Sequence, residues 1–151
     1  MSKSILQKLL SYPLILIGII MMILGIRWMN VDEPWMLDKV ANVERLNSSF
    51  IDLFSSTGSS INLEGYLTQI YRFFGFWVLT IGMLITSFSS PSIIIKKHVG
   101  IRLLPILGYM LIIGLYLGYT WIPSSHFIWL TWGLLGVYLL SLYAFLKLKN
   151  K

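Results

Sequence analysis

Four long runs of apolar residues dominate the chain, separated by short polar stretches and one longer connector. They cover residues 12–29, 66–88, 101–122 and 127–146. At a rise of about 1.5 Å per residue, a helix of about 20 residues crosses the hydrocarbon core of a bilayer, which is about 30 Å thick. The pattern therefore predicts an all-α integral membrane protein: a bundle of four transmembrane helices in a single domain, residues 1–151.

The ends of these runs carry the residues that begin and end helices. Only a few residues around Pro123 separate the third run from the fourth, which predicts an antiparallel hairpin. Pro123 ends the third helix, and Ser124 or Ser125 can cap the fourth. Asn62 is placed to cap the second helix.

The connector over residues 30–65 is the one stretch with soluble character. Asp32-Glu33-Pro34 is typical of a helix start. Apolar residues then recur at steps of three and four, which predicts an amphipathic helix over residues 35–54; its apolar stripe is Met36, Val40, Val43, Leu46, Phe50 and Leu53 or Phe54. Residues 55–60 would follow as a loop. The helix either lies on the membrane surface or covers a cavity as a lid.

Composition supports the membrane assignment. The chain is 56% hydrophobic and only 12% charged, whereas soluble domains carry about 25% charged residues. It has no cysteine, which excludes disulfides, thiolate nucleophiles and iron–sulfur ligation. The net charge of +6 sits at the ends of the apolar runs, where lipid headgroups lie, so we expect no nucleic-acid partner.

The placement of charge also predicts orientation. All six acidic residues fall in the long connector, between residues 32 and 64. Eight of the 12 basic residues share the opposite side: Lys3, Lys8, Lys96, Lys97, Arg102, Lys147, Lys149 and Lys151. Since Lys and Arg are retained in the cytoplasm, both termini are expected there, with residues 30–65 extracytoplasmic. In a bacterium this would be the cytoplasmic (inner) membrane.

A candidate polar site lies near the outer end of the second run. Arg72 stands about two turns inside that run, where a charge costs a few kcal/mol unless it is paired or reaches the headgroups. The candidate cluster is Arg72, Glu64, Gln69, Glu44 and His126, with Asp38 as a further possible partner of Arg72. It would either bind the polar head of a lipid or a quinone, or simply anchor the connector.

No enzyme motif accompanies these residues. His98 and His126 lie at opposite sides of the predicted membrane, so they cannot bind one metal ion, and no HExxH spacing occurs. No serine stands in a nucleophile-elbow pattern. We therefore expect no catalytic residue, no metal and no cofactor.

Regularly spaced glycines predict helix faces that approach closely. Gly18 and Gly25 are seven residues apart, as are Gly75 and Gly82, so each pair lies on one face. Gly114 and Gly118 form a small-xxx-small motif. These faces would pack inside the bundle, and any face left exposed could form a homodimer.

The second run reads Arg72-Phe73-Phe74-Gly75, with Gly82 one heptad later. This resembles the opening of the second helix in small bacterial four-helix membrane proteins of the DoxX-like kind. The layout also resembles the four-span scaffold protein of ergosterol biosynthesis. The resemblance implies a compact bundle that is an accessory or scaffold partner of membrane redox or lipid enzymes, with Arg72, Gly75 and Gly82 carried over.

The sequence thus favours an accessory or scaffold subunit, with the bilayer and a membrane protein or a second copy as partners. One alternative is a lipid- or quinone-binding protein with an outward-facing pocket around Arg72. Another is an oligomeric pore or transporter.

Overall fold

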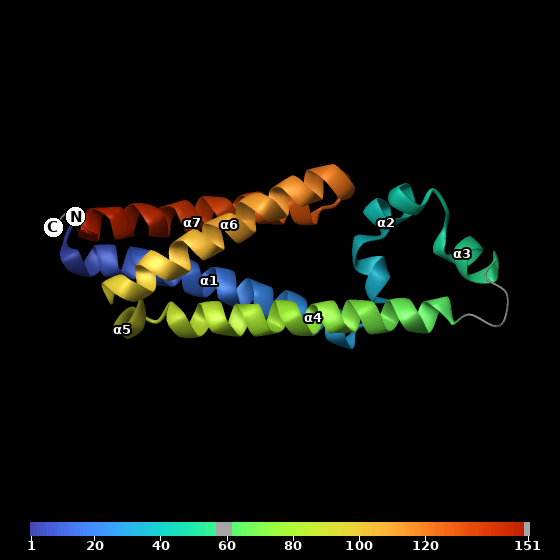
Figure 1. Ribbon diagram of the computed structural model, residues 1–151, viewed down its shortest axis with the longest axis horizontal. Helices are drawn as coiled ribbons and strands as arrows, with labels where there is room; N and C mark the ends of the chain where they lie inside the picture. The colour runs from blue at the N-terminus through green and yellow to red at the C-terminus, as the bar shows by residue number, and fades with distance from the viewer. Residues whose placement is uncertain (57–61, 150–151) are drawn as a thin grey trace.

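The computed structural model describes residues 1–56 and 62–149. Every regular element in these two ranges is a helix, and four are long and apolar enough to cross a membrane (Figure 1). These are α1 (Lys3–Asn30), α4 (Leu63–Phe88), α6 (Lys97–Trp121) and α7 (Phe127–Lys149). They coincide with the four predicted apolar runs and extend beyond most of them into polar residues.

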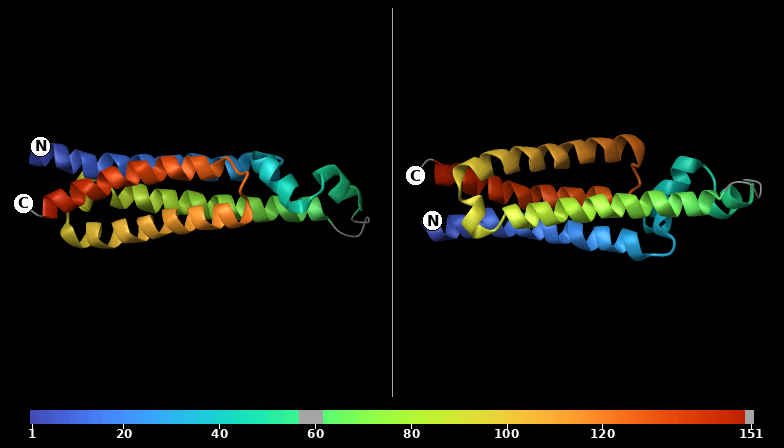
Figure 2. Two further views of the ribbon diagram at one scale, coloured as in Figure 1. Left: turned by 90° about the horizontal axis from the view of Figure 1, so that it is seen from above. Right: turned by 60° about the horizontal axis from the view of Figure 1, so that its bottom comes forward.

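The two ends of the molecule differ. Both termini and the short helix α5 (Pro91–Ile94) lie at one end, which we call the terminal end (Figures 1 and 2). The connector between α1 and α4 lies at the other, the connector end. At the terminal end, Ser11 Oγ of α1 donates to the Ser89 carbonyl at 2.5 Å, which ties the turn before α5 to α1.

Helix α1 is the centre of the bundle, since it packs against both α4 and α7. Helix α6 packs against α7, whereas α4 and α6 touch at few positions. The main core lies toward the terminal end, where α1 meets the two helices of the hairpin. Its most buried side chains include Leu6, Leu10, Leu14, Ile17, Leu104, Leu107 and Ala144.

The backbones of α1 and α4 are in direct contact at two pairs of glycines. A Cβ added to Gly25 would stand 2.7 Å from the Gly75 carbonyl oxygen and 2.5 Å from the Leu79 nitrogen. A Cβ on Gly82 would stand 2.7 Å from the carbonyl oxygen of Gly18. Because the helices are antiparallel, the first glycine of each helix meets the second of the other. The predicted glycine faces of α1 and α4 therefore pack against each other within one chain.

The glycines of α6 behave differently. Gly118 is buried, and a Cβ there would stand 3.1 Å from Ile128 of α7. Gly114 has no atom within 4 Å of such a Cβ. The predicted small-xxx-small motif is therefore split between a helix contact and an open surface.

The connector is not one amphipathic helix, which corrects the prediction for residues 35–54. It forms three short helices, η1 (Pro34–Asp38), α2 (Lys39–Leu46) and α3 (Phe50–Ser56), which we call the connector segment. The break falls at Asn47, whose φ of 51° is left-handed, a conformation that Asn tolerates better than most residues. Ser49 then caps α3, since its Oγ accepts the Asp52 N–H at 3.1 Å.

The residues of the predicted apolar stripe fall on three short helices and do not form one buried face. Of its residues Phe50 is buried, whereas Met36, Val40 and Leu46 are exposed. Of the loop expected at residues 55–60, only the first two belong to α3, and the others lie outside the described residues, as does Lys151.

The glycine contacts give the first testable prediction. Gly25→Ala would force the backbones of α1 and α4 apart and should lower stability by about 1–3 kcal/mol, as overpacking does. Gly133→Ala on α7 is the matched control, because no atom lies within 4 Å of its Cβ. Loss of helical circular dichroism during SDS titration of the purified protein measures both. Equal stability of the two variants would contradict the backbone contact.

Candidate functional site

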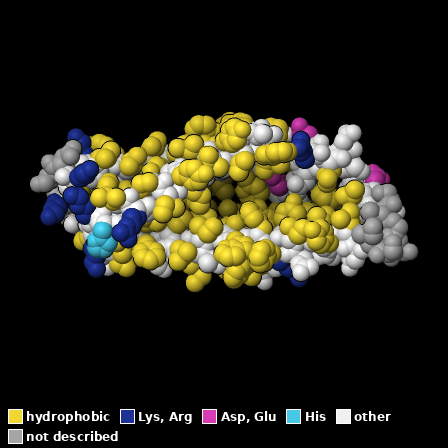
Figure 3. Space-filling model, viewed as in Figure 1, with side chains coloured by type: hydrophobic (Ala, Val, Ile, Leu, Met, Phe, Trp, Pro, Cys, Tyr) yellow, Lys and Arg dark blue, Asp and Glu magenta, His cyan; other side chains and the backbone are white. Residues whose placement is uncertain are grey.

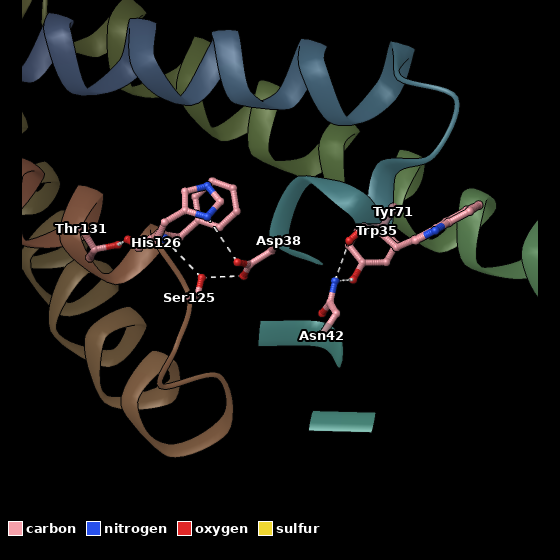
Figure 4. A network of polar contacts seen from close by, with 8 residues as sticks. Trp35, Asp38, Asn42, Tyr71, Ser125, His126 and Thr131 are labelled. Carbon is pink, nitrogen blue, oxygen red and sulfur yellow. Dashed lines mark hydrogen bonds and ion pairs between the residues drawn. The ribbon is translucent and has the colours of Figure 1, made fainter. Parts of the chain in front are cut away.

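A group of polar contacts between distant elements lies where the connector segment meets α4 and the α6–α7 hairpin (Figure 4). Ser125 Oγ donates to Asp38 Oδ2 at 2.5 Å, and His126 Nδ1 lies 3.3 Å from Asp38 Oδ1. The Asp38 side chain is 12% exposed and that of His126 63%. One carboxylate of η1 therefore holds both residues at the start of α7.

The hairpin turn positions these two partners. The Phe127 N–H donates to Ser125 Oγ at 3.2 Å, so Ser125 caps α7 while it also donates to Asp38. A carboxylate beside a helix N-terminus is favoured by the helix dipole. One turn later, Thr131 Oγ1 donates to the Phe127 carbonyl at 2.8 Å. Asp38 thus stabilises the first turn of α7 as well as docking the connector segment.

A second contact ties the connector segment to α4. Asn42 Nδ2 donates to the Trp35 carbonyl at 2.8 Å and lies 3.0 Å from the Tyr71 hydroxyl of α4. Trp35 is 1% exposed and packs edge-on against Phe54 with ring centroids 5.5 Å apart. The same short segment therefore bridges α4 on one side and the hairpin on the other.

Aromatic rings complete this junction. The guanidinium of Arg45 lies over the Trp121 ring at 4.9 Å, a cation–π contact between α2 and the end of α6. Trp28 of α1 lies 5.0 Å from the Phe74 ring of α4 and 4.9 Å from the Phe127 ring of α7. Three of the long helices are thus joined by rings next to the Asp38 contacts.

The residues of the predicted cluster are spread over α2, α4 and the turn before α7. His126 contacts Asp38, whose predicted partner was Arg72. Arg72, Glu64 and Gln69 are exposed on α4, and their side chains have no hydrogen bond or ion pair within the described ranges. Glu44 is exposed beside Arg45 and Trp121, at a cleft of about 190 Å³. No such bond joins any two of the five in that part of the chain.

Sequence reasoning missed Asn42 and the role of Asp38 and Ser125 as a pair. The one indication of this contact in the sequence is that the connector and the turn between the third and fourth apolar runs lie on the same side of the predicted membrane. Asp38 and Ser125 are 87 residues apart, however, and no periodicity reports a contact of that kind. The capping role of Ser125 was a local signal and could be read directly.

Ser125, His126 and Asp38 are the three residue types of a hydrolytic triad, but they are not arranged as one. In a hydrolytic triad the histidine stands between serine and acid and takes the serine proton. Here Ser125 donates to Asp38 directly, so His126 is not placed to act as its base. Among the described residues, no group of three or more His, Asp or Glu side chains could hold a metal ion. The arrangement is suited to docking one segment on another.

Asp38→Ala should release the connector segment from α7. Hydrogen bonds to charged groups contribute about 1.5–3 kcal/mol, so amide exchange in η1 and α2 should accelerate about tenfold or more. Hydrogen exchange with mass spectrometry measures this. Asp32→Ala is the control, because the Asp32 side chain has no bonded partner in the part of the chain that the structure describes. The same acceleration in both variants would mean that the Asp38 contacts do not hold the segment.

Comparison with known proteins adds no family to this geometry. No family model matches the chain, and neither a curated protein nor a solved structure matches it. The resemblance to DoxX-like proteins therefore stays a prediction. What is known of the site comes from its residues: a connector segment docked by Asp38, Asn42 and Arg45 across one end of an all-helical bundle.

Proposed function

We propose that the chain spans the bacterial cytoplasmic membrane four times, with both termini in the cytoplasm. The charge distribution supports this orientation. Figure 3 shows Lys and Arg side chains gathered mainly at the terminal end and Asp and Glu side chains toward the connector end. Positively charged ends are retained in the cytoplasm, so the connector segment would lie outside.

We further propose that the protein is an accessory or scaffold subunit that holds a membrane partner on α4. The observation that carries this proposal is the free face of α4, which packs closely on α1 alone among the four long helices. That face bears Phe73 and Trp77, which are 62% and 49% exposed, with Phe76 between them. Each phenylalanine ring stands edge-on to Trp77, at 5.9 and 5.6 Å.

Such a cluster is suited to a protein contact. Aromatic side chains are enriched at interfaces and provide many of their energetic hot spots, because they bury a large area for few rotatable bonds. Phe73, Phe76 and Trp77 are already ordered against one another, so a partner would fix few additional rotamers. Binding of a lipid or quinone head at Arg72 is a weaker alternative, since Arg72 is exposed and has no bonded partner in the described residues.

Cysteine labelling tests the orientation without background, because the chain has no cysteine. A membrane-impermeant maleimide should label Ser55→Cys in intact cells, since Ser55 is exposed on the connector segment. Ser92→Cys, exposed on α5, should be labelled only after the cells are permeabilised. The reverse pattern would overturn the proposed topology, and no labelling of either site before lysis would contradict membrane insertion in this orientation.

Purification in mild detergent tests the accessory role. The wild-type protein should migrate on native gels as a complex of fixed stoichiometry, with a partner protein or with itself. Phe73→Ala combined with Trp77→Ala should weaken the complex about tenfold or more, because truncated hot-spot residues cost about 2 kcal/mol or more. The control is Trp129→Ala, which removes a 77% exposed ring from α7 instead. A monomeric wild type, or equal loss in both variants, would contradict the proposal.

A further inference from the structure

Helices α4 and α6 are joined through α5 at the terminal end and diverge toward the connector end (Figures 1 and 2). Between them lies a lateral groove of about 960 Å³, open to the side of the bundle. Figure 3 shows the molecule hollowed on this face. The walls are almost wholly apolar and include Leu84 and Phe88 of α4 and Leu103, Ile106, Met110 and Ile113 of α6.

The groove is charged at one end only. His98 and Arg102, on the first turns of α6, line it at the terminal end. Along α6, its lining continues from there to Leu117, which is about 22 Å further at the helical rise. A groove with one cationic end and a long apolar wall is complementary to an amphiphile that has an anionic head and an apolar tail.

The basic side chains at this end have no acidic side chain beside them in the part of the chain that the structure describes. Lys96, Lys97 and Arg102 lie within seven residues at the start of α6, with His98 among them, and the helix dipole is itself positive there. All six acidic residues belong to the stretch from Asp32 to Glu64, at the connector end. The four basic side chains have no hydrogen bond or ion pair with any described residue. An external anion would relieve this repulsion.

We propose that the groove binds one anionic phospholipid of the cytoplasmic leaflet. Its phosphate lies at Arg102 and His98, and its acyl chains follow the apolar walls toward Gly114. The volume lies at the upper end of the range of about 300–1,000 Å³ for small-molecule sites, and the open side lets acyl chains extend beyond the groove. The inference rests on the proposed membrane orientation, which puts the cationic end in the cytoplasmic leaflet. It is independent of the partner surface on α4 and lies at the opposite end from Arg72.

Native mass spectrometry of the protein released from lipid nanodiscs tests this inference. In discs with equal phosphatidylglycerol and phosphatidylcholine, the wild type should retain one phosphatidylglycerol, with about tenfold preference over phosphatidylcholine. His98→Gln combined with Arg102→Gln should abolish the preference. Lys147→Gln should preserve it, because Lys147 is a cation at the same end but on α7 and outside the groove.

A second variant tests the apolar part of the site. Gly114→Phe should fold, since no atom lies within 4 Å of a Cβ there, and its ring would fill the far part of the groove. We expect loss of lipids with long acyl chains and retention of short-chain phosphatidylglycerol. Unchanged retention of both chain lengths would overturn the assignment of the chains to this groove.

The outcomes separate this inference from the proposed function. Failure of the chain to enter nanodiscs would contradict membrane insertion itself. Entry without a preference for phosphatidylglycerol, or a preference that survives the double substitution, would overturn the lipid site alone. A protein cross-linked in the groove in place of lipid would overturn it as well.

Discussion

The contact between the backbones of α1 and α4 sets the arrangement of the other helices. In lipid, apolar surfaces gain little from meeting one another, so helices associate where small residues allow close van der Waals packing. Gly18 and Gly25 provide such a surface against Gly82 and Gly75. With one face of α1 fixed on α4, α7 packs on another face, and α6 reaches the bundle mainly through α7. The groove between α4 and α6 is a consequence of this order.

The two ends of the bundle are held by different forces. At the terminal end, leucines and small residues form a dense core, and Ser11 bonds to the Ser89 carbonyl. At the connector end, the polar contacts of Asp38 and Asn42 dock a segment whose outer surface still exposes Val40 and Ile51. Packing of the first kind depends on shape and volume, whereas the second kind depends on a few directed bonds. A single substitution can therefore release the connector segment without disturbing the core.

Local sequence patterns predict helices, caps and turns, but they do not predict contacts between residues that are distant in the chain. The four long helices, the caps at Asn62 and Ser125 and the tight turn at Pro123 follow from local patterns. The single connector helix was wrong because an apolar stripe keeps its period across a break, and only the φ of Asn47 reveals it. The bond between Asp38 and Ser125 depends on how two distant segments are placed by the whole bundle.

The connector segment and the groove are linked through the hairpin. Helix α6 is anchored at its start by α5 and at its end by the turn that contains Ser125. Asp38 and Arg45 contact the hairpin at that second end, through Ser125, His126 and Trp121. Asn42 ties the same segment to Tyr71 of α4. The segment therefore bonds to α4 and to the end of the hairpin, beyond the residues that line the groove, and its contacts connect the two helices at the end where they diverge.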